Sequence, residues 1–207
     1  MKNQLLIIFA KNPVEGRVKT RLARTVGQVK ALKIYNALLS YTKQVTMELD
    51  IDRQIWFSDQ IPVQSPFNAN GYEPLVQQGE DLGERMLQAF QRAFDQGYEQ
   101  VTIIGTDCAF ITSDHIDRAF ERLNEVEVVL GPSADGGYYL LGMRQLHPFL
   151  FKDKSWSTAD LFDETTQALE RRGIVWEALP CLNDVDTWKD WLEARERIQN
   201  KVKQDIE

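Results

Sequence analysis

The stretch QLLIIFAKNPVEGRVKTRLAR, residues 4–24, joins an apolar run to a basic segment and is the starting point for the fold class. Its first part, Gln4–Ala10, is almost continuously apolar, which predicts a strand buried on both faces. Lys11-Asn12-Pro13 then predicts a loop, because asparagine and proline favour turns. In open α/β sheets ligands bind beyond the carboxyl ends of the strands, so the segment after this strand is a candidate ligand site.

Strands and helices alternate along most of the remaining chain. We expect further strands at 53–58, 74–77, 101–105, 126–131, 138–143 and 174–179. We expect helices at 32–45, 82–94, 116–123 (capped by Ser113), 161–171 and 187–202. This alternation predicts an α/β protein with a largely parallel sheet. Because there is no repeat or long linker, we expect residues 1–207 to form a single domain.

The overall composition restricts the class of partner. The chain has 24 Lys+Arg against 31 Asp+Glu and a formal net charge of −7, which disfavours binding to nucleic acid. The longest early apolar run, Leu5–Ala10, is too short for a signal peptide or a membrane span. We therefore expect a cytoplasmic protein without a membrane span, with Cys108 and Cys181 reduced.

The segment Lys11–Arg24 is basic although the whole chain is acidic. It contains five cations, among them Lys19 and Arg21, against the single acid Glu15. Gly16 lets the backbone approach a ligand closely, and the cations can neutralise phosphate oxygens. Walker A and GxGxxG patterns are absent, so the alternative is a solvated basic loop.

Carboxylates follow two other expected strands. Asp107 comes directly after the strand at 101–105, where it can hold a divalent cation that also binds a diphosphate. Asp184 and Asp186 precede the last helix and can complete the same metal site. The alternative for Asp186 is a role as helix N-cap beside Thr187, so Asp184 is the stronger candidate ligand.

The segment GPSADGGYYLLG, residues 131–142, contains a glycine turn between two expected strands. Gly136 and Gly137 permit close backbone approach, and Asp135 can accept hydrogen bonds from sugar hydroxyls. The alternative is a simple hairpin turn.

The motifs together resemble a bacterial family of GT-A-type glycosyltransferases within the nucleotide-diphospho-sugar transferase superfamily, associated with radical-SAM genes or arsenosugar biosynthesis. The resemblance rests on six segments: FAKNPVEGRVKTRLA (9–23), GEDLGERM (79–86), IIGTDC (103–108), GPSADGGYYLLGM (131–143), WST (156–158) and DVDT (184–187). One departure is Ala109, where the family usually has proline, and it loosens the loop beside Asp107.

The resemblance implies a three-layer, Rossmann-like GT-A fold with a mostly parallel mixed sheet and with the nucleotide over the loop after the first strand. It implies that Lys19 and Arg21 contact the phosphates and that Asp107 is the metal-binding aspartate. Related nucleotidyltransferases often place metal ligands at a DxD like Asp184/Asp186. We expect Asp107, Asp135 and Lys19 to be catalytic, with Mg²⁺ or Mn²⁺ at the metal site. The residues expected to bind substrate are Ala10, Gly16, Lys19, Arg21, Asp81, Arg85, Gly136 and Gly137.

Three functions are compatible with these residues. The leading hypothesis is metal-dependent glycosyl transfer from a nucleotide-diphospho-sugar to a small-molecule acceptor. The alternatives are nucleotidyl transfer to a phosphorylated small molecule, with release of pyrophosphate, and a non-catalytic nucleotide-binding module. Both transfer reactions need a neutralised polyphosphate, so the basic segment and the aspartates serve either one.

Overall fold

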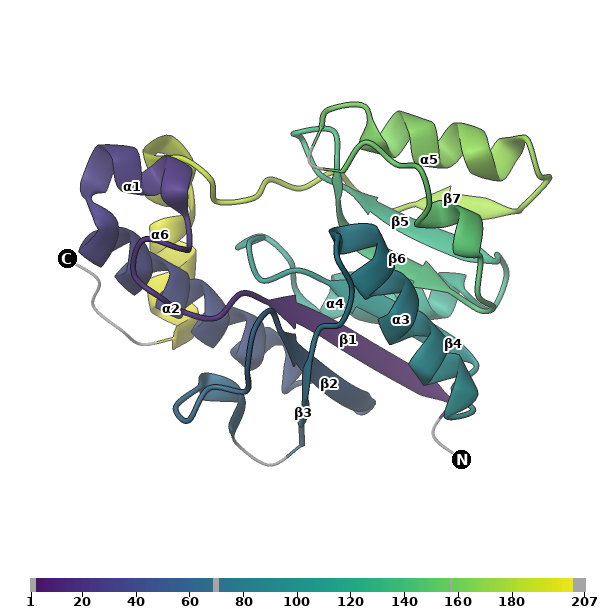
Figure 1. The fold of residues 1–207 in the computed structure, drawn as a ribbon, viewed down its shortest axis with the longest axis horizontal. Coiled ribbons are helices and arrows are strands. Elements are labelled where there is room, and N and C mark those ends of the chain that lie inside the picture. Colours follow the sequence, from purple (N-terminus) through teal and green to yellow (C-terminus); the bar gives the residue numbers. More distant parts are fainter. Residues whose placement is uncertain (1–2, 69–70, 157, 203–207) are drawn as a thin grey trace.

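The computed structural model describes residues 3–68, 71–156 and 158–202, and within them the strands form one mixed sheet (Figure 1). The strands are β1 (Gln4–Ala10), β2 (Asp52–Phe57), β3 (Glu73–Val76), β4 (Gln100–Ile104), β5 (Val128–Pro132), β6 (Tyr138–Met143) and β7 (Trp176–Ala178). Their order across the sheet is β3-β2-β1-β4-β6-β5-β7. The sheet is mostly parallel, with β6 antiparallel to both β4 and β5.

The helices cover both faces of this sheet. They are α1 (Thr20–Val26), α2 (Gln28–Thr46), α3 (Leu82–Asp95), α4 (Ser113–Arg122), α5 (Leu161–Glu170) and α6 (Trp188–Val202), with short 3₁₀ turns at Pro66–Asn68 and Pro148–Leu150. None of the helices in the described part of the chain is both long and apolar enough to cross a bilayer. The expected α/β, Rossmann-like architecture with a mostly parallel mixed sheet is confirmed.

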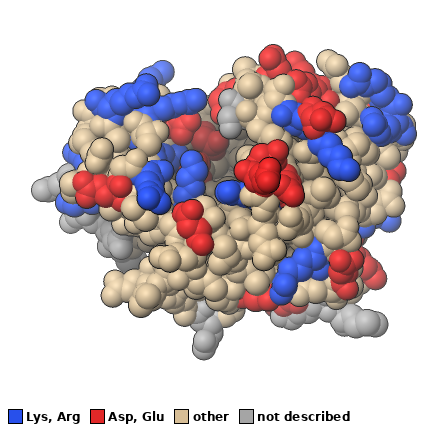
Figure 2. Space-filling view, viewed as in Figure 1, with Lys and Arg blue, Asp and Glu red and all other residues tan. Residues whose placement is uncertain are grey.

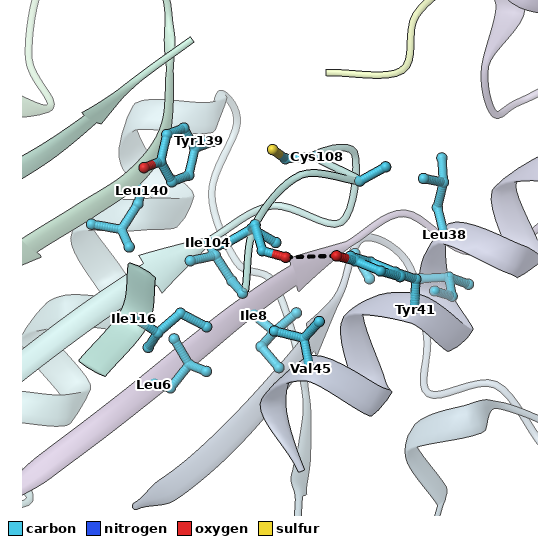
Figure 3. Packing of buried hydrophobic residues seen from close by; sticks show 14 of the residues in the cluster. Leu6, Ile8, Leu38, Tyr41, Val45, Ile104, Cys108, Ile116, Tyr139 and Leu140 are labelled. Atoms are coloured by element: carbon cyan, nitrogen blue, oxygen red, sulfur yellow. Dashed lines mark hydrogen bonds between the residues drawn. The ribbon is translucent and has the colours of Figure 1, made fainter. Parts of the chain in front are cut away.

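Alternating strand residues face two separate apolar cores, because successive side chains of a strand point to opposite faces. Leu6 and Ile8 of β1 pack with residues of α2, α4 and α6, whereas Leu5 and Ile7 pack with residues of α3 and α5. Figure 3 shows part of the first core, in which the Tyr41 hydroxyl on α2 donates to the Ile111 carbonyl at 2.8 Å. The result is three layers, with the sheet between two layers of helices.

The parallel pairings place the ends of four strands at the same edge of the sheet. β1 is parallel to β4, and β5 is parallel to β7. Because β6 is antiparallel to both of its neighbours, β5 also runs parallel to β4. The segments that follow β1, β4, β5 and β7 therefore leave the sheet on one side, and each of them carries residues singled out from the sequence.

Two local predictions need correction. The pattern predicts only a loop over residues 11–24, but Thr20–Val26 forms α1. This helix has a single buried residue, Leu22, so it lacks the repeated apolar spacing by which an amphipathic helix is identified. The N-cap of α4 is Thr112 and not Ser113, because the helix begins one residue earlier than its apolar pattern indicates.

Candidate active site

The site lies where the strand order reverses. β1 is followed by β2 on one side in the sheet, whereas β4 lies on the other side of β1, so the connections from these strands leave in opposite directions. Such a switch point is the usual ligand site of open α/β sheets. Lys11 and Asp107 follow these two strand ends.

The Lys19 ammonium group is the centre of the site. It lies 3.0 Å from Asp107 Oδ1 and 3.2 Å from Asp186 Oδ1, and only 4% of its side chain is exposed. The Arg21 guanidinium lies 3.2 Å from Asp186 Oδ2. Burial by itself would lower the pKa of Lys19, but the carboxylates of Asp107 and Asp186 outweigh it and raise the pKa. Lys19 is therefore a fixed positive charge at neutral pH.

The backbone at Lys19 is also unusual. Its φ is 47°, a left-handed conformation that is uncommon for residues other than glycine. Such conformations persist where the surroundings fix them, and they gather at functional sites. Here Lys19 is the N-cap of α1, and its amine lies beside the Asp107 carboxylate that follows β4.

The Asp184 carboxylate lies close to the same cluster. Burial raises its pKa to about 7, and the negative charges of Asp107 and Asp135 add to the shift, while Lys19 opposes it. No described residue donates a hydrogen bond to this carboxylate. The backbone N–H of Val185 donates to the Asp107 carbonyl at 2.9 Å, which fixes the segment after β7 against the loop after β4.

The structure assigns Asp186 a different role from helix capping. The Asp190 carboxylate accepts from the Thr187 N–H at 2.7 Å and from the Thr187 hydroxyl at 2.8 Å, so these two residues cap α6. The Asp186 carboxylate instead contacts Lys19 and Arg21. The sequence preference for Asp184 over Asp186 therefore rested on a capping role that Asp186 does not have.

Two residues that sequence reasoning had not singled out hold the loops in place. The Tyr35 hydroxyl on α2 accepts from the Lys11 N–H at 2.8 Å, donates to the Lys11 carbonyl at 3.0 Å and lies 3.3 Å from Thr106 Oγ1. The buried Asn12 side chain accepts from the Asp59 N–H at 2.8 Å and donates to the Gln60 carbonyl at 2.7 Å. In the sequence these two residues show only local features. Tyr35 lies on the apolar face of an expected helix, and Asn12 lies in an expected turn.

Asp135 lies in a tight turn between β5 and β6. Its Oδ1 accepts from the Ser133 hydroxyl and from the Gly137 N–H, which holds the exposed carboxylate at the sheet edge near Asp184. Gly136 has a φ of 88°, and a Cβ there would lie 2.0 Å from the Ala159 carbonyl oxygen. The turn is therefore built around a residue without a side chain.

We expect Gly136→Ala to lower the free energy of unfolding by about 2–3 kcal/mol, because it adds both a positive-φ penalty and a backbone clash. The matched control is Gly137→Ala. Its Cβ would meet only Asp135 Oδ1, at 3.3 Å, so we expect a loss below about 1 kcal/mol. Urea unfolding of both variants checks the difference, and equal losses would contradict this explanation of the turn.

The other expected substrate-binding residues make contacts with nearby loops and helices. The Ala10 carbonyl at the end of β1 accepts from the Ser58 N–H at 2.9 Å. Gly16, with a φ of 76°, turns the basic loop beside the Gln28 side chain. Asp81 caps α3 by accepting from the Glu84 N–H at 2.8 Å, and Arg85 donates to the Gly79 carbonyl at 2.9 Å. The contacts of Asp81 and Arg85 are local, and their substrate roles stay predictions.

Basic side chains gather beside a hollow in the surface. Figure 2 shows this hollow between the part of the molecule that carries α1 and the part that carries α5, with Lys and Arg side chains on the α1 side. The expected motif Trp156–Thr158 includes Ser157, which lies outside the described residues.

A divalent cation needs several oxygen ligands arranged around one point. Among the described residues, no group of three Asp, Glu, His or Cys side chains is already arranged around one point as metal ligands are. In this structure the Lys19 ammonium bridges Asp107 and Asp186. The available donors are nevertheless hard carboxylate oxygens, the type that Mg²⁺ and Mn²⁺ prefer. Asp184 is partly buried and receives no hydrogen bond from the described residues. Its carboxylate is therefore chemically suited to bind a cation.

The family follows from the sequence match. Residues 41–158, more than half of the chain, match the family described as "Uncharacterized protein conserved in bacteria (DUF2064)". The chain belongs to this family. No curated protein matches the DUF2064 chain by sequence.

Solved structures are similar over almost the whole chain. A candidate nucleotide-diphospho-sugar transferase from Desulfovibrio desulfuricans G20 is 29% identical with a TM-score of 0.84, over 97% of this chain and 99% of that one. The inositol-1-phosphate CTP transferase from T. maritima is 13% identical with a TM-score of 0.61, over 100% and 99%. Rv0371C from Mycobacterium tuberculosis H37Rv, in complex with manganese, is 16% identical with a TM-score of 0.50, over 94% and 98%. At sequence identities this low, the last two similarities show a shared fold and nothing more.

Proposed function

We propose that the protein transfers a glycosyl group from a nucleotide-diphospho-sugar to a small-molecule acceptor, in a reaction that needs Mg²⁺ or Mn²⁺. The observation that carries the proposal is the cluster of Lys19, Arg21, Asp107 and Asp186 at the switch point between the ends of β1 and β4. The similarity to a candidate nucleotide-diphospho-sugar transferase supports the same reaction class.

The two cations suit the leaving group of this reaction. When the bond between the anomeric carbon and the diphosphate oxygen breaks, negative charge builds on the diphosphate. Lys19 and Arg21 lie within ion-pair distance of Asp186, so both reach the same point at the strand ends. Cations fixed where charge develops lower the barrier, because they need no rearrangement during the reaction.

Asp135 is the proposed base of the transfer. As the acceptor oxygen forms its bond to the anomeric carbon, its proton passes to this carboxylate. The Ser133 and Gly137 hydrogen bonds occupy Oδ1 and fix the orientation of the side chain. Asp135 is exposed, so an acceptor can reach it.

Asp107, Asp184 and Asp186 are the proposed metal ligands. When bound, a divalent cation neutralises part of the charge on the diphosphate. Binding at these carboxylates would replace the contact that Lys19 makes with Asp107, and would free its ammonium group for a phosphate oxygen. The crowding of negative charge around Asp184 supports this assignment, because a cation relieves it.

Nucleotidyl transfer is the second candidate. The specific observation that favours it is the shared fold with a CTP transferase. In nucleotidyl transfer, a phosphorylated small molecule attacks the α-phosphorus of a nucleoside triphosphate. The same cations would then stabilise pyrophosphate as the leaving group.

A binding screen followed by product analysis tests both candidates. We expect nucleoside diphosphates and nucleotide-sugars to raise the melting temperature only when Mg²⁺ or Mn²⁺ is present. A ligand at a hundredfold excess over its Kd adds about 2.7 kcal/mol of stability, which a thermal-shift assay detects easily. Pyrophosphate released from a nucleoside triphosphate plus a sugar phosphate would favour nucleotidyl transfer and contradict glycosyl transfer. Metal-dependent binding without any turnover would favour a non-catalytic module.

A further inference from the structure

A cavity of about 150 Å³ lies beside the candidate site, on the side of the sheet covered by α3 and α5. Its walls come from the carboxyl ends of β1 and β4, the start of β6 and the starts of α3 and α5. They include Phe9, Met86, Ile103, Tyr138, Trp156 and Leu161. The walls are therefore mainly apolar and in part aromatic.

Gly105 lines this cavity and leads directly into Thr106 and Asp107. A Cβ at Gly105 would meet no atom within 4 Å, and its φ lies outside the left-handed region. Neither the backbone nor the packing of the protein therefore requires glycine here. The missing side chain leaves space between the cavity and the loop that carries Asp107.

The walls of the cavity are held in place by close packing. A Cβ at Gly83 of α3 would lie 2.5 Å from Trp156 Nε1 and 2.3 Å from the Phe151 carbonyl oxygen, so the backbone of α3 packs directly on the indole ring. The rings of Tyr138 and Trp156 meet edge to face, with centroids 6.5 Å apart. The cavity is thus preformed, as small-molecule sites usually are.

We propose that this cavity binds an apolar group of the acceptor, a single ring or a branched alkyl group, while the reacting hydroxyl of the acceptor faces the strand ends that carry Asp107 and the proposed base Asp135. This inference rests on the proposed transfer reaction. The apolar walls cannot pair with the many hydroxyls of a sugar, which would lose their hydrogen bonds with water. The volume suits a group about the size of benzene, which an engineered apolar cavity of similar size binds.

Benzyl alcohol is the test probe, because it joins one ring to one hydroxyl, and methanol is the probe without the ring. We expect wild-type protein to bind benzyl alcohol at least tenfold more tightly than methanol, since each buried methylene contributes about fourfold. Binding of both probes is measured by saturation-transfer NMR, with and without CDP, UDP or GDP and Mn²⁺.

Two variants enlarge residues that line the cavity, one directly after β4 and one at the start of α5. We expect Gly105→Val and Leu161→Phe each to weaken benzyl alcohol binding at least tenfold, while the melting temperature and the binding of nucleoside diphosphates change little. Val63→Phe, at a side chain that is 94% exposed, adds apolar volume at the surface and is the control. If Gly105→Val unfolds, Leu161→Phe decides the result.

Two outcomes would overturn the inference. One is benzyl alcohol binding that neither filling variant weakens, and the other is displacement of benzyl alcohol by a nucleoside diphosphate, which would assign the cavity to the nucleotide. Failure of the proposed function gives a different result. The wild-type protein would then bind no nucleotide with any metal, while benzyl alcohol would still bind and the two filling variants would still weaken it.

Discussion

Asp107→Asn is expected to reduce metal-dependent transfer by about a thousandfold. A divalent cation should then no longer strengthen nucleotide binding. The aspartate follows β4 at the switch point of the sheet and has a side chain that is 44% exposed, so a cation and a diphosphate can reach it. The neutral amide loses the negative charge that holds a cation, although it keeps nearly the same shape.

The fold should survive this change. The asparagine carbonyl oxygen can still accept from Lys19, and Lys19 keeps its contact with Asp186. The Val185 N–H donates to the backbone carbonyl of residue 107, which the substitution does not alter. We expect the free energy of unfolding to change by less than about 1 kcal/mol, because the ion pair is partly exposed.

Transfer rates and thermal shifts with and without Mn²⁺ measure the effect of Asp107→Asn. Asp50→Asn is the matched control, since Asp50 lies beside Gln4 and Gln100 at the other edge of the sheet. Metal-dependent nucleotide binding that persists unchanged in Asp107→Asn would show that the metal ligands have been assigned wrongly.

Lys19→Met is expected to destabilise the protein by about 1–3 kcal/mol at neutral pH, as well as to weaken nucleotide binding. Removing one partner of a buried ion pair typically destabilises by about 3–5 kcal/mol, and the partial exposure of Asp107 and Asp186 reduces that figure here. Methionine keeps most of the volume and the apolar character of the lysine stem, so the change tests the charge.

The pH dependence distinguishes lost charge from lost packing. The raised pKa of Lys19 means that its charge stabilises the folded state at every pH below its unfolded value, which includes neutral pH. Lys19 also opposes the rise in the pKa of the buried Asp184 carboxyl, so this pKa rises further when the lysine charge is removed. The stability lost in Lys19→Met should therefore grow from pH 5 to pH 8, and Mn²⁺ should restore part of it.

Arg21→Met is the matched control for Lys19→Met. The Arg21 side chain is 69% exposed and pairs with Asp186 at the surface, so its removal should change stability by less than about 1 kcal/mol. Denaturant unfolding of both variants at several pH values gives the comparison. A deficit in Lys19→Met that is independent of pH would indicate a packing role for the lysine stem in place of the charge.

Local patterns in the sequence determined most of the secondary structure. The apolar run Gln4–Ala10 coincides with β1, because a strand buried on both faces needs uninterrupted apolar residues. The basic segment after β1 and Asp107 after β4 were also evident, since charge and strand ends can be recognised without long-range contacts. Helix α1 was missed because one buried residue gives no periodicity, and its packing on α2 stabilises it instead.

The partners of the charged residues were decided by the tertiary structure. Lys19 and Asp186 are 167 positions apart, and they meet because β1, β4 and β7 end at the same edge of the sheet. From the sequence alone, Asp186 was a candidate metal ligand with a helix cap as the alternative, because Thr187 and Asp190 have the spacing of a capping motif. The fold showed that Thr187 and Asp190 form that cap themselves and that Asp186 faces the cations. Local spacing determines which hydrogen bonds a segment can make, whereas the order of strands in the sheet determines which distant charges neutralise one another.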